Sequence, residues 1–206
     1  TPTSRTHQRR KEARPGELAD AALDLLVERG FAATRLDDVA AAAGVSKGTL
    51  YLYFDSKEAL FRAVVEQNIL PVIEDAELIV ADHQGSAAEL LAELMRGWWQ
   101  RVGATKAGGV TKLIVTEARN FPDLAAWYHD AVVARAKRLI CGVLELGIQR
   151  GEFRALDVGL AFHAIFAPVM MLMIWRHSIG ACCGQGIDPD EYIELSIDLI
   201  LNGLKP

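Results

Sequence analysis

The chain contains few cysteines, and their spacing suits no structural use. Cys141, Cys182 and Cys183 are an odd number and lack the spacing of metal ligands. They predict neither a disulfide framework nor a zinc site, and they fit a reducing compartment. The N-terminal stretch is polar and basic with no apolar run behind it, so we expect no signal peptide. The expected location is therefore the cytoplasm.

The chain also lacks an excess of positive charge. Its formal net charge is -5, which argues against a protein that coats nucleic acid through bulk charge. Any binding to DNA must therefore be local. A basic cluster at the N-terminus faces a single acidic residue, and it is either a solvated tail or an arm that contacts phosphates. The basic residues of this cluster are Arg5, Arg9, Arg10, Lys11 and Arg14, and the acidic one is Glu12.

Long apolar runs are scarce, with one exception. Residues 158–175 are almost wholly apolar, and this length approaches the roughly 18 residues at which a membrane-spanning helix becomes a candidate. His163 and Pro168 interrupt the run, and no second run or positively charged flank accompanies it. We therefore expect no membrane partner, because a helix that is apolar all round can instead be buried on both faces.

Motifs of catalysis are missing as well. The sequence holds no Gly-rich phosphate loop, no nucleophile elbow and no paired metal motif. His129 and His163 are expected to be ordinary core or surface histidines, because no second ligand accompanies either at helical spacing. We therefore expect a protein that is not an enzyme and that uses no cofactor or metal.

Proline and glycine gather at a few places, which favours long helices between them. Hydrophobic residues make up 51% of the chain and charged residues 24%, the balance of a protein with a core. Together with the spacing of apolar residues, this predicts an all-α fold of about nine helices. The expected helices cover residues 15–29, short segments beginning at Thr34, Lys47 and Lys57, and then residues 87–104, 110–120, 122–150, 156–179 and 189–203.

Capping residues mark several of these boundaries. Thr34, Ser46 and Ser56 are expected N-caps, because their side chains can accept the first free amide protons of a helix. Gly44 is expected to end the second helix. Pro71 should kink or end the fourth helix, because it lacks an amide proton and collides with the preceding turn.

Three residues fit a helix-turn-helix. Ala40 is small where two helices touch, Gly44 can take a positive φ in the turn, and Leu50 is an apolar anchor under the second helix. In a chain so rich in alanine, this triplet alone is weak evidence. The longer string at residues 44–60 is more specific, and it reads Gly-Val-Ser-Lys-Gly-Thr-Leu-Tyr-Leu-Tyr-Phe-Asp-Ser-Lys-Glu-Ala-Leu.

This string resembles the DNA-binding domain of the tetracycline-repressor (TetR) family. Members carry a similar run after a first helix that ends in Gly-Phe and a second helix that starts at Thr, and Gly30, Phe31 and Thr34 stand at those places here. The close resemblance covers residues 18–65. It implies a helix-turn-helix domain at residues 15–62, after a flexible basic arm at residues 1–14 and before a ligand-binding and dimerisation domain at residues 63–206.

The helix that follows Ser46 should present its N-terminal residues to the major groove. We expect Lys47 and Thr49 to read bases, and Gly48 to let the backbone approach DNA closely. By resemblance, Tyr51 and Tyr53 reach phosphates, and helix N-termini near Thr34 and Lys57 attract phosphate as well. For Lys57, a surface charge without function stays open. The full predicted DNA-binding set is Thr34, Arg35, Ser46, Lys47, Gly48, Thr49, Tyr51, Tyr53 and Lys57.

One such helix rarely suffices, so specific binding implies a homodimer. The helices at residues 156–179 and 189–203 carry more apolar surface than one chain buries, and they are the expected interface. Aromatic and methionine residues of the C-terminal helices could line an apolar ligand pocket, although such residues are more often ordinary core. The candidates for ligand binding are Trp98, Trp99, Trp127, Phe162, Phe166, Met170 and Met173.

These expectations combine into one functional hypothesis. The protein binds double-stranded operator DNA as a repressor, and it leaves a palindromic operator when a small, largely apolar effector binds the C-terminal domain. Two alternatives stay open on the sequence alone, a transcriptional activator and a DNA-binding dimer of the same fold that responds to no ligand.

Overall fold

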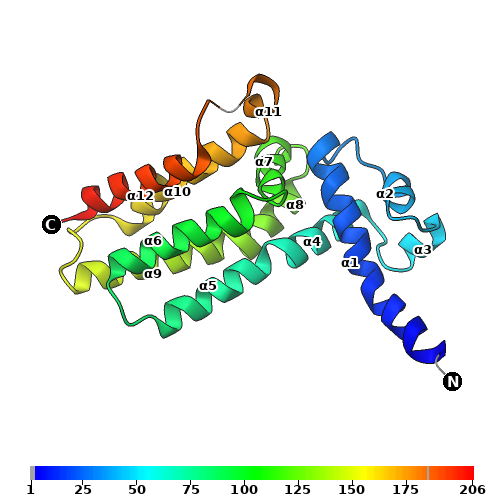
Figure 1. Ribbon diagram of the computed structural model, residues 1–206, viewed down its shortest axis with the longest axis horizontal. Helices are drawn as coiled ribbons and strands as arrows, with labels where there is room; N and C mark the ends of the chain where they lie inside the picture. Colours follow the sequence, from blue (N-terminus) through cyan, green and yellow to red (C-terminus); the bar gives the residue numbers. More distant parts are fainter. Residues whose placement is uncertain (1–2, 185) are drawn as a thin grey trace. The chain divides into compact units, whose positions relative to one another are not determined.

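The computed structural model describes residues 3–184 and 186–206, and their side chains from Arg14 onward. The described residues form helices, turns and loops without a β-strand, so the predicted all-α fold is confirmed (Figure 1). The chain divides into two compact units, Thr1–Ile69 and Leu70–Pro206. The sequence predicted a division after residue 62, whereas the fourth helix continues without a break to Asn68.

The first unit holds four helices, and its first helix is longer than predicted. They are α1 (Thr3–Arg29), α2 (Leu36–Ala42), α3 (Lys47–Tyr51) and α4 (Lys57–Asn68). The sequence predicted that the first helix starts at Pro15, but Pro15 lies inside α1, where its ring removes one backbone hydrogen bond. The basic arm predicted at residues 1–14 falls largely on residues whose side chains lie outside the described part.

The core of the first unit forms where α1 packs against α4. The rings of Phe31 and Phe61 are both fully buried and meet edge to face, with their centroids 5.8 Å apart. This geometry is favourable because the positive ring edge meets the negative ring face. Leu18 and Leu26 of α1 and Val64 of α4 complete this buried layer.

Two of the three predicted N-caps are confirmed. Ser46 Oγ accepts a hydrogen bond from Thr49 N at 3.1 Å, and Ser56 Oγ accepts one from Ala59 N at 3.1 Å. The prediction that Thr34 caps the second helix is wrong, because the N-cap of α2 is Arg35. The hydroxyl of Thr34 instead turns inward, 2.7 Å from Gly30 O and 3.2 Å from Leu25 O, and ties the loop to the end of α1.

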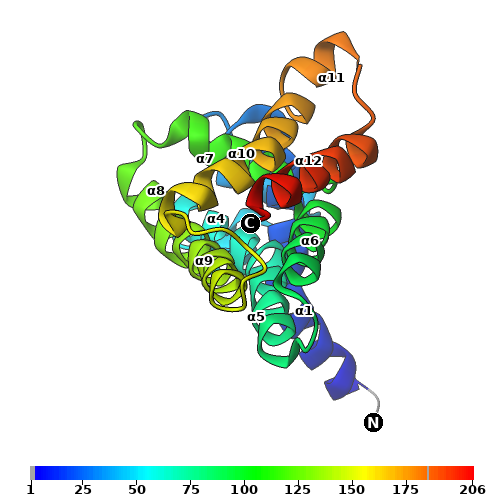
Figure 2. The ribbon, with the colours of Figure 1, turned by 90° about the vertical axis from the view of Figure 1, so that its left-hand side faces the viewer.

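The second unit is a bundle of longer helices (Figure 2). Two π-helical turns, η1 and η2, interrupt helices that the sequence predicted as continuous at residues 87–104 and 122–150. Such turns insert one extra residue into the helical ladder and occur often at functional sites. The elements are α5 (Leu70–Asp82), α6 (Ala87–Trp98), η1 (Trp99–Gly103), α7 (Gly108–Glu117), α8 (Pro122–Tyr128), η2 (His129–Val133), α9 (Ala134–Gln149), α10 (Val158–Arg176), α11 (Ile179–Cys183) and α12 (Pro189–Leu204).

Helix α5 was not predicted as an element of its own. Pro71 was expected to kink or end the helix before it, and α4 does end at Asn68. A new helix begins at Leu70, so Pro71 occupies its first turn. Its missing amide proton has no cost there, because the first amides of a helix have no partner within the helix.

Helix α10 is apolar on all sides. Within the described residues it is the one helix long and apolar enough to cross a membrane, and 28% of its most apolar stretch is buried. A single helix of this kind is weak evidence for a membrane span. It lies beside α12, and both helices expose large apolar side chains, among them Leu160 on α10 (71% exposed) and Leu199 on α12 (63% exposed).

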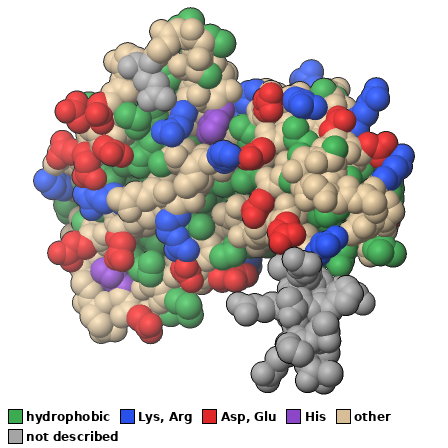
Figure 3. Space-filling view, turned by 45° about the vertical axis from the view of Figure 1, so that its right-hand side comes forward, with side chains coloured by type: hydrophobic (Ala, Val, Ile, Leu, Met, Phe, Trp, Pro, Cys, Tyr) green, Lys and Arg blue, Asp and Glu red, His purple; other side chains and the backbone are tan. Residues whose placement is uncertain are grey.

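Charged side chains of both signs are interspersed over the molecular surface shown in Figure 3. This distribution agrees with the net charge of -5. The net charge argues against bulk positive charge as the means of binding DNA.

Gly147 allows the end of α9 to pack tightly against Phe153. A Cβ at residue 147 would overlap the Phe153 ring, whereas a Cβ at Gly142 of the same helix would meet no atom within 4 Å. We expect Gly147→Ala to lower the free energy of unfolding by about 1–3 kcal/mol through overpacking. Gly142→Ala should raise it by up to about 1 kcal/mol through helix propensity. Urea unfolding followed by circular dichroism tests this pair, and equal effects of the two substitutions would contradict the packing argument.

Candidate DNA interface and ligand cavities

Helix α3 has one anchored face and one free face. Leu50 is fully buried and Phe54 nearly so, which fixes the helix on the core of the first unit. Ser46, Lys47, Gly48 and Tyr51 are exposed, while Thr49 and Tyr53 are half-buried, so the predicted reading residues mostly reach solvent. The preceding turn depends on Gly44, whose φ of +66 is a left-handed conformation that other residues adopt at a cost.

Lys47 is held in place across the turn. Its Nζ lies 2.9 Å from Asp37 Oδ2 of α2 and 5.8 Å from the centroid of the Tyr51 ring. The hydrogen bond to Asp37 and the charge of that carboxylate raise the pKa of Lys47 above its usual value. The pair is exposed, and exposed ion pairs contribute little to stability. Lys47 can therefore exchange Asp37 for an acceptor on DNA at low cost.

Gly48 and Thr49 have different surroundings at the start of α3. A Cβ at residue 48 would meet only Ser46 Oγ, at 3.9 Å, so packing within the protein does not require glycine there. The close approach of DNA to the backbone at Gly48 stays a prediction. Thr49 Oγ1 lies 2.8 Å from Ser46 Oγ, which orients the hydroxyl at the exposed end of the helix.

Thr34 and Lys57 make contacts that the sequence did not reveal. The side chain of Thr34 is 2% exposed, so its hydroxyl does not reach the surface, whereas neighbouring Arg35 is exposed. Lys57 Nζ donates to Phe31 O at 2.5 Å and Ala32 O at 3.2 Å, and lies 4.5 Å from the centroid of the Phe31 ring. Lys57 therefore ties the start of α4 to the loop that follows α1.

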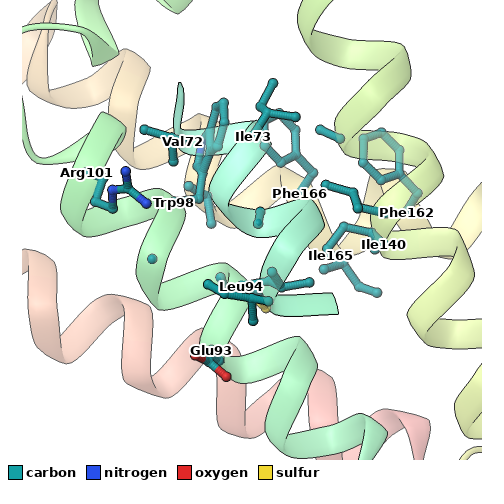
Figure 4. Close-up of a pocket in the computed structure, with 17 residues that line it drawn as sticks. Val72, Ile73, Glu93, Leu94, Trp98, Arg101, Ile140, Phe162, Ile165 and Phe166 are labelled. Atoms are coloured by element: carbon teal, nitrogen blue, oxygen red, sulfur yellow. The ribbon is translucent and has the colours of Figure 1, made fainter. Parts of the chain in front are cut away.

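Two neighbouring cavities lie in the described part of the second unit. The first, of about 80 Å³, lies among α5, α6, η1, α9 and α10, and the second, of about 310 Å³, lies among α6, α7, α8, η2, α9 and α10. Trp98, Ala136, Phe162 and Phe166 line both cavities and form the wall between them. In this wall, Phe162 and Phe166 stack at 5.7 Å between centroids, and the edge of Trp98 meets Phe166 at 6.3 Å (Figure 4).

The structure brings together four of the seven residues predicted to bind a ligand. Trp98, Phe162 and Phe166 line both cavities, and Met170 lines the second. Trp99, Trp127 and Met173 line neither of these two cavities. Met173 is fully buried in the core, and Trp99 Nε1 donates to Asp190 Oδ1 at 3.1 Å.

Sequence reasoning missed much of the first cavity wall. Val72, Ile73, Ala76 and Ile79 of α5 all face this cavity, but α5 was not predicted. The spacing of these four residues is that of one helical face, so a separate search for periodicity after Pro71 could have found them. The two charged residues of the lining, Glu93 and Arg101, were also missed.

Few polar groups reach these cavities. Trp98 Nε1 is buried and has no hydrogen-bond partner among the described residues. An orphaned buried donor of this kind is costly unless a water or a ligand accepts from it. In the second cavity, the hydroxyls of Thr111 and Tyr128 lie 3.1 Å apart. The linings are therefore mostly apolar, and the cavities can hold an apolar molecule.

Both units of the chain are similar to known proteins. Residues 18–64 match the family model described as bacterial regulatory proteins, tetR family, and residues 81–180 match the one described as tetracyclin repressor-like, C-terminal domain. The chain is 29% identical over 201 residues to the HTH-type transcriptional repressor KstR2 of Rhodococcus jostii, covering 94% of this chain and 92% of that protein. It is 32% identical over 149 residues to the HTH-type transcriptional regulator YfiR of Bacillus subtilis, covering 70% of each.

Solved structures share the fold of this chain. One is the transcriptional regulator FadR from Bacillus subtilis in complex with stearoyl-CoA, with a TM-score of 0.76 and 23% identity. The match covers 91% of this chain and 98% of that one. At this level of identity, the likeness concerns the arrangement of the helices.

Burial of Tyr128 generates a prediction about stability at high pH. Burial raises the pKa of Tyr128 to about 12, while its hydrogen bond to Thr111 has a smaller, opposite effect. In the unfolded chain a tyrosine has a pKa of about 10, so the stabilising contribution is complete below about pH 10 and lost as pH rises through about 12. In that window, the free energy of unfolding of the wild type should fall with pH more steeply than that of Tyr128→Phe, by up to about 1.4 kcal/mol per pH unit.

Urea unfolding at several pH values measures this difference in slope. Tyr51→Phe is the matched control, because it removes the same hydroxyl from an exposed ring. Equal slopes for the wild type and Tyr128→Phe would contradict the burial argument.

Proposed function

Because the chain belongs to the tetR family of bacterial regulatory proteins, we propose that it represses transcription as a homodimer and is released from its operator by a small molecule. The observation that carries this proposal is the free face of α3, which leaves Ser46, Lys47, Gly48 and Tyr51 exposed above the buried anchor Leu50. A helix presented in this way fits the major groove. Such a regulator acts in the cytoplasm, where its DNA lies.

Repression is favoured over activation by KstR2 of Rhodococcus jostii, which is similar over 94% of this chain and whose name describes a transcriptional repressor. The repressor's DNA contacts are the exposed residues of α3 together with Arg35. Thr34 and Lys57 support these contacts from within, since the hydroxyl of Thr34 and the ammonium of Lys57 hold the loop before α2. Tyr53 is half-buried, so part of its side chain is available for a phosphate contact.

The homodimer is supported by the unpartnered apolar side chains on α10 and α12. These two helices lie side by side, and each exposes large apolar side chains along its outer face. Two copies that pair these faces form a four-helix interface and remove that apolar surface from water. A symmetric pair also supplies two α3 helices for the two half-sites of a palindromic operator.

The effector is a largely apolar molecule held in the two cavities of the second unit. The aromatic wall of Trp98, Phe162 and Phe166 offers it apolar contact on both sides. The FadR structure, which holds stearoyl-CoA, gives an instance of an apolar chain bound by a protein of this fold.

Substitutions on α3 test DNA binding. We expect Lys47→Ala to weaken specific binding about tenfold through loss of a base contact, and Tyr51→Phe to weaken it by a smaller factor through loss of a phosphate contact. The measurement is the mobility shift of the DNA next to the protein's own gene, at near-physiological salt with excess competitor DNA. Lys106→Ala, which makes the same chemical change as Lys47→Ala at an exposed residue outside α3, α10 and α12, should bind like the wild type. A lack of sequence preference at every salt concentration would overturn the proposal.

Substitutions on α10 and α12 test the dimer. Leu160→Glu and Leu199→Glu each place a charge in the proposed interface and should raise the dimer dissociation constant at least about a hundredfold. Leu78→Glu is the control, because Leu78 is equally exposed but lies on α5. Sedimentation equilibrium reports the mass of each variant. Dimers of unchanged affinity in both interface variants would place the interface elsewhere.

A further inference from the structure

Arg101 takes part in two features of the second unit at once. It is the basic residue in the lining of the first cavity, and its Nη2 lies 2.5 Å from Asp75 Oδ2 on α5. Figure 4 shows Arg101 next to Trp98 at one side of the cavity, with Phe162 and Ile140 at the other. The cavity is therefore apolar along most of its length and has a guanidinium at one end.

We propose that the effector is an amphipathic anion, whose acid group replaces Asp75 as the partner of Arg101 while its apolar body fills the cavity. This inference rests on the proposed function and adds the chemical class of the effector and the contact through which it acts. A guanidinium suits this role because its planar set of donors binds a carboxylate, sulfonate or phosphate through two parallel hydrogen bonds.

The exchange is energetically easy. The side chains of Arg101 and Asp75 are 43% and 52% exposed, and an ion pair exposed to this degree contributes little to stability. An acid group attached to an apolar body that already occupies the cavity has a high effective concentration at Arg101. Burial of the apolar body then supplies most of the binding free energy.

The position of Asp75 connects this exchange to the DNA-binding unit through the chain. Asp75 lies on α5, which begins directly after Ile69, the C-cap of α4. A second ion pair holds α5 from the other side, where Arg135 of α9 binds both carboxylate oxygens of Glu77 at 3.0 and 2.8 Å. An anion at Arg101 therefore removes the ion pair between α5 and η1, while the ion pair between α5 and α9 remains.

Glu93 is the other charged residue of the lining, and it would favour a cation. Figure 4 shows its carboxylate at the far side of Leu94, turned away from the apolar side chains. Glu93 is exposed on α6, and the described structure shows no ion pair for it within 4.0 Å. The anion is therefore favoured, and a role for Glu93 is an outcome that the test must detect.

Two fluorescent probes with matched apolar bodies test the proposal. Anilinonaphthalene sulfonate is an anion, and phenylnaphthylamine is its neutral counterpart without the sulfonate. The wild type should bind the sulfonate about tenfold more tightly, the scale of a hydrogen-bonded charge. Arg101→Gln should abolish this preference, and Asp75→Asn should increase it a few-fold by removing the competitor. Neither substitution should change the affinity for phenylnaphthylamine.

These two variants form an internal control. Both break the same ion pair, so a change that they share reports the loss of that pair, while opposite changes in sulfonate affinity report an anion site at Arg101. Arg135→Gln removes a guanidinium outside the cavity, and Glu93→Gln removes the carboxylate of the lining. Neither substitution should alter the preference for the sulfonate over the neutral probe. Ala136→Leu fills the wall between the cavities and should weaken both probes, with circular dichroism confirming that each variant is folded.

Several results would overturn the inference. The wild type could bind the two probes equally tightly or bind neither. Arg101→Gln could keep the preference for the sulfonate, or Glu93→Gln could change this preference as much as Asp75→Asn does. A parallel mobility-shift assay separates this inference from the proposed function. If both probes release the protein from DNA but it does not prefer the sulfonate, the proposed repressor function stands and the anion site is rejected. If the protein prefers the sulfonate but does not bind DNA specifically, the anion site stands and the repressor function is rejected.

Discussion

Helix α10 carries apolar side chains on every face, and the second unit is arranged around the need to cover them. Its inner face, with Phe162, Ile165 and Val169, lines the cavities and packs against neighbouring helices. Its outer face, with Leu160 and Met171, stays exposed in the single chain. One helix therefore borders both the proposed effector and the proposed partner subunit, so a molecule that displaces the inner side chains bears on the interface as well.

In the cavities, apolar and charged groups are separated. Aromatic rings form the wall between the two cavities, and the guanidinium of Arg101 stands at the edge of the first cavity, paired with Asp75. Pairs at the edge are weak because water screens them, whereas burial of an apolar body in the cavity is favourable. This contrast favours a ligand that has an apolar body and a group that competes for an edge charge.

The first unit holds the short helix α3 in place and leaves the polar face of this helix exposed. Leu50 and Phe54 anchor α3 from below, and the contact between Phe31 and Phe61 holds α1 against α4. Lys57 contributes to this scaffold through the carbonyl groups after α1. The exposed side chains of α3 are therefore positioned by residues that need not touch DNA.

The amino-acid sequence by itself determined the helix-turn-helix, its glycine turn and the caps at Ser46 and Ser56, because these features depend on residues a few positions apart. It also indicated that α10 and α12 hold excess apolar surface. Only the tertiary structure decided the inward role of Thr34, the contacts of Lys57, the π-helical turns, and which aromatic residues meet at the cavities. The pair of Arg101 and Asp75 belongs to this second group. The physical reason is that such contacts join side chains far apart in the chain, and their partners are chosen by the packing of whole helices.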